Sequence, residues 1–99
     1  MKTNIQGTTL TVAGIAELSA TSSTTFRDQT RAALTAAVTT LDIDLSLTTF
    51  VDSSGLGSLI ALHKTMAGRG GALRIIKPTP TVVQILELTR LHRILEIVS

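Results

Sequence analysis

Residues 41–57 read LDIDLSLTTFVDSSGLG, and this stretch decides the fold. Its first part alternates leucine or isoleucine with aspartate or serine, which is the period of a β-strand with one buried face. We expect a strand over residues 41–51. The side chains that should be buried on it are Leu41, Ile43 and Leu45. After Asp52 the apolar residues recur at intervals of three and four, which predicts a helix that starts between Ser53 and Leu56 and runs to Gly68.

The segment before this stretch also changes from one period to the other. Residues 9–15 are rich in β-branched and apolar side chains and are broken by Gly14, which favours one or two strands. We expect these opening strands to pair antiparallel at one edge of a sheet. A spacing of three and four then predicts a helix over residues 22–40. The residues with this spacing are Phe26, Thr30, Ala33, Leu34, Ala37, Val38 and Leu41.

The segment after this stretch alternates in the same way. The buried face of the helix that starts near Ser54 is predicted to hold Leu56, Leu59, Ile60, His63 and Met66 or Ala67. A strand follows at 73–76, a helix runs from Pro80 or Thr81 to Leu88, and the last few residues of 91–98 form a strand. Strands that alternate with helices imply a mainly parallel sheet. The sequence therefore predicts one α/β domain over residues 1–99, with a mixed, mostly parallel sheet of four to five strands and helices packed on it.

The composition fits a single small domain. Of the 99 residues, 43% are apolar and 16% are charged, which suits one modest core and argues against disorder. The chain has no cysteine, which excludes disulfides, thiolate metal ligands and thiol nucleophiles. No apolar run approaches the roughly 18 residues of a membrane span, and the N-terminus lacks an apolar signal segment. We expect a cytoplasmic protein that does not enter a membrane.

The charge pattern argues against direct binding to nucleic acid. Nine basic and seven acidic residues leave a net charge of +2, and the basic residues are scattered along the chain. The aromatic side chains are Phe26 and Phe50 alone, whereas proteins that bind single strands use several stacking rings.

The richest motif is the six residues DSSGLG at positions 52–57, where a strand ends and a helix begins. In parallel α/β sheets this edge is where ligands and partners meet the fold, and a helix N-terminus attracts anions. The two glycines keep the surface low, so that another protein could approach the backbone. An alternative role is purely structural, since aspartate or serine caps helices and glycine permits turns. From the residues alone the structural role is favoured.

Motifs of catalysis are missing. The DSSGLG motif at 52–57 matches neither a phosphate-binding loop nor a nucleophile elbow. His63 lies in the apolar stripe of a helix, and His92 is expected on a surface loop, so neither is expected to act as a base or as a metal ligand. Asp42 and Asp44 point the same way along a strand, where solvated or capping roles are commoner than a paired-acid site. We expect no catalytic residue, no metal and no cofactor.

Residues 44–57 resemble the central motif of STAS domains, in the branch of the anti-sigma factor antagonists. The later segments GGALRI at 70–75, PTP at 78–80 and LELT at 86–89 fit the second half of that family. Upstream, AELSA at 16–20 lies where the family tends to show G-E-L-D. The resemblance covers roughly residues 9–98.

This resemblance implies a bacterial switch protein of transcription regulation, and not an enzyme. Such an antagonist binds an anti-sigma factor that is also a serine kinase and thereby releases a sigma factor. The kinase phosphorylates the first serine of the motif, here Ser53, and a serine phosphatase reverses this partner switching. The implied partner-binding residues are Asp52, Ser54, Gly55, Leu56 and Gly57, together with Ser19 and Thr21 in the upstream loop. Ser54 is expected to cap the helix with its side chain.

Two other functions stay open. One is a non-enzymatic STAS scaffold module in a stress-signalling assembly or a transport complex, and the other is a small enzyme or ligand-binding domain. The chain also departs from the family pattern. Ala16 and Ser19 replace the glycine and aspartate of G-E-L-D, and Arg90 replaces a glycine after the third helix, where a left-handed conformation would be costly. Many relatives add a terminal helix after the position of Ser99, and its absence would leave an apolar face open for a homodimer.

Overall fold

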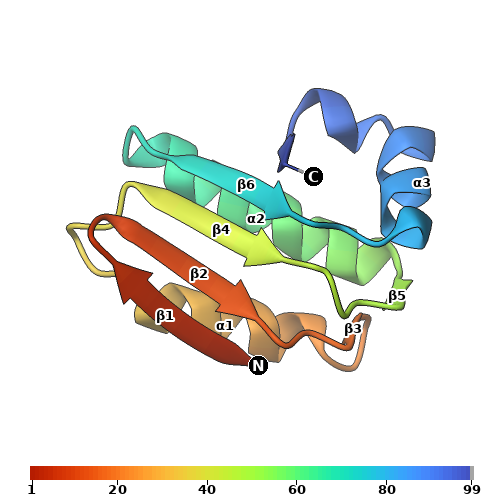
Figure 1. Ribbon diagram of the computed structural model, residues 1–99, viewed down its shortest axis with the longest axis horizontal. Coiled ribbons are helices and arrows are strands. Elements are labelled where there is room, and N and C mark those ends of the chain that lie inside the picture. Colours follow the sequence, from red (N-terminus) through yellow and green to blue (C-terminus); the bar gives the residue numbers. More distant parts are fainter. Residues whose placement is uncertain (99) are drawn as a thin grey trace.

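The computed structural model describes residues 1–98, which form one α/β domain (Figure 1). The strands are β1 (Lys2–Gln6), β2 (Thr9–Ala13), β3 (Glu17–Leu18), β4 (Thr40–Asp44), β5 (Phe50–Val51), β6 (Ala72–Ile76) and β7 (Glu96–Val98). The helices are α1 (Ser23–Ala33), α2 (Ser53–Gly68), α3 (Pro80–Leu88) and the short 3₁₀ helix η1 (Leu91–Arg93). This order confirms the α/β class.

The main sheet has the strand order β1-β2-β4-β6-β7, and all of its pairs are parallel except one. β1 and β2 form an antiparallel hairpin at one edge, as the sequence predicted. Its turn contains Gly7 with φ +61°, a conformation that glycine adopts readily. A second, two-stranded parallel sheet, β3 with β5, stands at the end of the main sheet where β4 finishes.

The core lies between the main sheet and the two long helices, which both lie behind the sheet in Figure 1. Leu41, Ile43 and Leu45 are fully buried, which confirms the prediction from the alternating pattern. The other face of β4 and β6 carries a cross-strand pair. Arg74 donates from Nε and Nη2 to the two carboxylate oxygens of Asp42, both at 2.8 Å. Asp42 is therefore only 9% exposed, and its role is an ion pair rather than paired-acid chemistry.

The first long helix is shorter than predicted, and the expectation of a helix over 22–40 is wrong beyond Ala33. The chain must turn there to enter β4 beside the end of the first hairpin, where the Thr39 N–H donates to the Thr8 carbonyl at 2.9 Å. Arg69 from the end of α2 holds the turn, since its Nη1 donates to the carbonyls of Thr35 at 2.7 Å and Val38 at 3.3 Å. Tertiary contacts thus override a helical spacing.

The strand predicted over 41–51 is interrupted after Asp44. Its carboxylate accepts a hydrogen bond from the Ser46 N–H at 2.9 Å, which starts a turn. Thr48 is buried and donates from Oγ1 to the Ile15 carbonyl at 2.6 Å. As a result Leu47 is 67% exposed although it continues the alternating pattern, and β5 belongs to the second sheet.

Helix α2 buries a slightly different face from the one predicted. Leu59 and Met66 are buried as expected, but Leu62 takes the central position, while His63 is only half-buried. The prediction of a helix from Pro80 or Thr81 to Leu88 is confirmed by α3. The Thr79 side chain accepts a hydrogen bond from the Val82 N–H, and Pro80 occupies the first turn.

Arg90, which replaces the glycine of the family pattern, adopts a left-handed backbone conformation with φ +62° and ψ +16°. A side chain in this region costs about 1–2 kcal/mol, whereas glycine adds about 0.5–1 kcal/mol of unfolded-state entropy. We expect Arg90→Gly to raise the free energy of unfolding by about 0.5–1 kcal/mol in denaturant titrations. Arg93→Gly in η1 is the control, because the φ of Arg93 is not positive, and it should be neutral or destabilising. Equal effects of the two changes would contradict this explanation.

Candidate functional site

The motif at 52–57 lies where β5 passes directly into α2, as the sequence predicted. Asp52 is the N-cap residue, and its Oδ1 accepts a hydrogen bond from the Gly55 N–H at 3.0 Å. The expectation that Ser54 caps the helix is therefore wrong. Aspartate takes this role because its extended backbone conformation aims the carboxylate back at the first turn, while both serines already belong to the helix.

Asp52 also joins the motif to the upstream loop between β3 and α1. Its Oδ2 accepts from the Ala20 N–H at 3.0 Å, and its own N–H donates to the Leu18 carbonyl at 3.0 Å. One carboxylate thus holds the start of α2 against a loop that is 32 residues away in the chain. The structure brings the loop that contains Ser19 and Thr21 next to the motif.

The two glycines of the motif differ sharply in their surroundings. Gly55 is buried against β3, where an added Cβ would overlap the Leu18 carbonyl oxygen and lie 2.6 Å from the Leu18 Cβ. Gly57 is exposed, and an added Cβ there has open space around it. Gly55 therefore permits close packing of helix on strand, whereas Gly57 is not required by packing.

Both serines of the motif are exposed at the first turn of α2. Within residues 1–98 neither hydroxyl takes part in a side-chain hydrogen bond. Backbone N–H groups of a first helical turn lack helical partners, and the helix dipole favours negative charge there. The arrangement can therefore accept an added anionic group on a serine without the loss of an existing side-chain contact.

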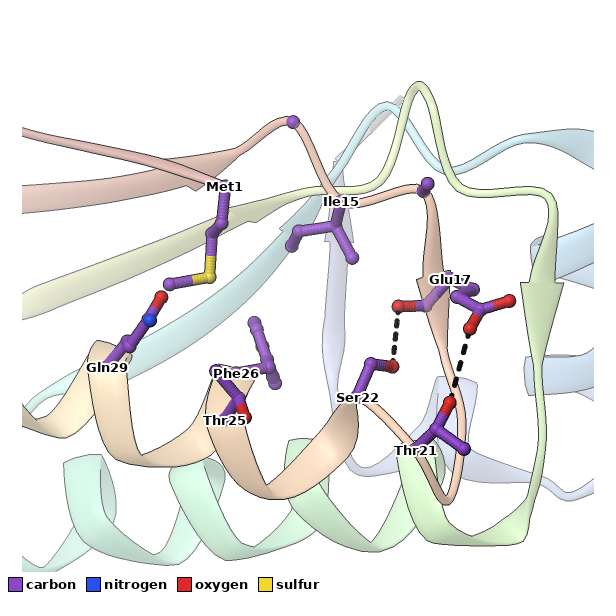
Figure 2. A pocket seen from close by; sticks show the side chains of 10 residues that line it. Met1, Ile15, Glu17, Thr21, Ser22, Thr25, Phe26 and Gln29 are labelled. Carbon is purple, nitrogen blue, oxygen red and sulfur yellow. Dashed lines mark hydrogen bonds between the residues drawn. The ribbon is translucent and has the colours of Figure 1, made fainter.

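The two upstream residues proposed for partner binding differ in exposure. Ser19 is 7% exposed, and its Oγ lies 3.2 Å from Glu17 Oε1 and 3.0 Å from Thr21 Oγ1. Thr21 is exposed. Figure 2 shows the Thr21 hydroxyl directed at the Glu17 carboxylate and the Ser22 hydroxyl at the Glu17 carbonyl. This network fixes the loop, and Thr21 rather than Ser19 presents its side chain to solvent.

Two apolar side chains near the motif were missed by the sequence reasoning. Leu47 is 67% exposed and Phe50 is 51% exposed, and they precede Asp52 by five and two residues in the chain. The alternating pattern did not mark them, because it continued the strand through the turn at 46–49. Phe50, the nearer of the two in the chain, adds apolar area beside the polar motif.

The pKa of Asp52 lies below its ordinary value of 3.8, mainly because the Gly55 N–H bonds the carboxylate and further backbone N–H groups, including that of Ala20, add to this. A lowered folded-state pKa gives stability that is present above pH 3.8 and is lost as the pH falls through the folded-state pKa. We expect Asp52→Asn to have a lower free energy of unfolding than the wild type near neutral pH. The difference in free energy of unfolding between the two proteins should shrink as the pH drops below about 4. Denaturant titrations from neutral to acidic pH measure this, and a constant difference would contradict it.

Neither a metal centre nor a membrane-spanning helix is found among residues 1–98. No group of three or more histidine, aspartate or glutamate side chains is placed to hold a metal ion. His63 and His92 lie on different elements, and His92 Nδ1 is 3.3 Å from the Leu86 carbonyl. None of the helices described is both long and apolar enough to span a bilayer.

A family model described as "Mlab, STAS domain" matches residues 1–98. Among solved structures, a candidate anti-sigma factor antagonist from Thermotoga maritima, TM1081, has a TM-score of 0.87 and 21% identity, over 99% of this chain and 85% of that one. The anti-sigma factor antagonist SpoIIAA in its unphosphorylated form has a TM-score of 0.74 and 19% identity, over 99% and 86% of the two chains.

The phosphorylated form of SpoIIAA, described as a Bacillus cell fate determinant, has a TM-score of 0.73 and 20% identity, over 99% of this chain and 90% of that one. A search of curated protein sequences finds no match. At these identities the likeness to solved structures establishes a common fold.

Proposed function

The chain belongs to the STAS domain family, and on that premise we propose that it is an anti-sigma factor antagonist. In this proposal it binds an anti-sigma factor serine kinase and releases a sigma factor. Phosphorylation of Ser53 switches the binding off, and a serine phosphatase restores it. The chain itself acts as a binding partner and not as an enzyme.

The observation that carries the proposal is the division of roles between Asp52 and Ser53. Asp52 caps α2 and holds the upstream loop, which leaves the Ser53 hydroxyl exposed at the first residue of the helix. A residue that is needed neither for capping nor for packing can be modified without a loss of fold. The likeness to SpoIIAA, solved in a phosphorylated and an unphosphorylated form, adds support.

The physical basis of the switch is charge at a contact surface. A phosphoserine adds roughly −1.5 to −2 charges, which the N-terminus of α2 tolerates. A partner that packs on this surface would have to desolvate the phosphate beside the carboxylate of Asp52, and burial of an unpaired charge is costly. Phe50 and the half-buried Leu56 offer apolar area that such a partner would cover.

Phosphorylation is the direct test of the proposal. We expect the wild type, incubated with its anti-sigma factor kinase and ATP, to gain a single phosphate by intact-protein mass spectrometry. Ser53→Ala should gain none, whereas Ser54→Ala, the matched neighbour, should still gain one. A phosphate on the Ser53→Ala variant would contradict the assignment.

A scaffold role is the second candidate, and a separate surface favours it. Leu88 is 77% exposed and Ile94 is 55% exposed, and both lie in the α3–η1 segment rather than in the motif. A second apolar contact would suit a module of a stress-signalling assembly or a transport complex. Size-exclusion chromatography of the native protein separates the two, since a large multi-protein assembly favours the scaffold and a monomer or dimer favours the antagonist.

A further inference from the structure

A hollow of about 350 Å³ opens between the β2–β3 connection and α1. Ile15 and Phe26, which line it, are buried in the core, with exposed fractions of 5% and 4%. Met1 and Gln29 stand at one end and Glu17 and Thr21 at the other (Figure 2). The volume falls within the range of pockets that hold small organic molecules, about 300–1,000 Å³.

The lining of the hollow has a definite chemical character. Glu17 is the one charged side chain among the residues that line it, and the α-ammonium group of Met1, at the opposite end, is the one basic group. Threonine and serine hydroxyls and one amide supply further polar groups near the apolar floor. A ligand with an apolar body could cover Ile15 and Phe26, and a positively charged head could meet the carboxylate.

The carboxylate of Glu17 has capacity left for such a head. Its Oε1 accepts long hydrogen bonds from Ser19 Oγ at 3.2 Å and Thr21 Oγ1 at 3.4 Å. Within residues 1–98 Glu17 takes part in no ion pair. An ionised carboxylate offers about four acceptor positions, so an ammonium group could bind without displacement of the hydroxyls.

We propose that this hollow is a binding site for a small amphiphile with an apolar body and a primary ammonium head, which lies against Glu17. The proposal does not depend on the phosphorylation switch. The ammonium of such a ligand would make a charge-assisted hydrogen bond with Glu17, while its apolar body would be removed from water over Ile15 and Phe26. An acidic ligand in the same orientation is disfavoured, because its head would approach Glu17 with like charge. In the reversed orientation its head would lie toward Met1 and away from Glu17, so that its affinity should not depend on the Glu17 carboxylate.

The methyl group of Met1 can report binding at this site. It has two methionines, of which Met1 lines the hollow and Met66 is fully buried in the core. In protein labelled with ¹³C at the methionine methyl groups, octylamine should shift the Met1 signal in a saturable manner and leave the Met66 signal in place. Octanol and octanoate are the matched neutral and acidic probes.

The affinities should follow the charge of the head group. Because an exposed ion pair contributes up to about 1 kcal/mol, octylamine should bind up to about fivefold tighter than octanol. Glu17→Gln should remove the advantage of octylamine over octanol. Thr25→Phe, at an exposed position of α1 that lines the hollow, should weaken all three ligands.

Three results would overturn the proposal. The first is equal shifts of the Met1 and Met66 signals, or a Met1 shift that does not saturate, which would indicate non-specific binding. The second is octanol bound as tightly as octylamine. The third is an unchanged affinity of Glu17→Gln for octylamine.

Discussion

Gly55→Ala should destabilise the domain by about 3 kcal/mol or more, the largest effect on stability that we expect from the loss or gain of one methyl group. The added Cβ would overlap the carbonyl oxygen of Leu18, which is backbone and cannot rotate away as a side chain could. In the same place the Gly55 N–H bonds Asp52, so that a shift of the helix would also break its cap. For a domain of this size the midpoint of thermal unfolding should fall by more than about 12 °C.

Gly57→Ala is the matched control, two residues further along the same helix. A Cβ meets open space there, so the change should only improve helix propensity and raise the free energy of unfolding by about 1 kcal/mol. Circular dichroism melts of both variants measure the contrast. If both substitutions change the free energy of unfolding by the same amount, the close packing of α2 on β3 does not constrain residue 55.

Most of the fold could be predicted from the spacing of the apolar residues in the sequence. Alternation over residues 41–45 predicted that Leu41, Ile43 and Leu45 are buried, and each is fully buried. The errors arose where a local pattern ran on past a tertiary contact. The apolar spacing of α1 continues to Val38, but the side chain of Arg69 and the pairing of β2 with β4 require a turn after Ala33.

The candidate site could be predicted only in part from the sequence. The strand-to-helix junction follows from the order of the residues, and the structure confirms it. The bond from the Ala20 N–H to Asp52 and the burial of Gly55 depend on the β3–α1 segment, which is more than 30 residues away and has no local signal. The exposure of Phe50 likewise follows from a turn that the alternating pattern concealed.

Phosphorylation of Ser53 should weaken the complex with the anti-sigma factor kinase on the order of a hundredfold. The estimate follows from the several kcal/mol that like charges or unpaired charges cost when they are placed in an interface. The fold should be retained, because the modified hydroxyl is exposed and the cap of α2 is supplied by Asp52. Calorimetric titration of the phosphorylated and unphosphorylated forms measures the affinity, and their thermal melts check the fold.

Three variants separate the charge effect from simple damage to the surface. Ser53→Ala should bind as tightly as the unmodified wild type and stay bound in the presence of ATP, because it cannot be modified. Ser53→Asp should fall between the two forms, since it adds one charge and two oxygens where phosphate adds nearly two charges and three oxygens. Gly57→Glu places a carboxylate in open space on the same turn of α2 and should also weaken binding with little change in stability. If the phosphorylated protein holds the kinase as tightly as Ser53→Ala does, charge at the start of α2 does not control the partner, and the switch must lie elsewhere.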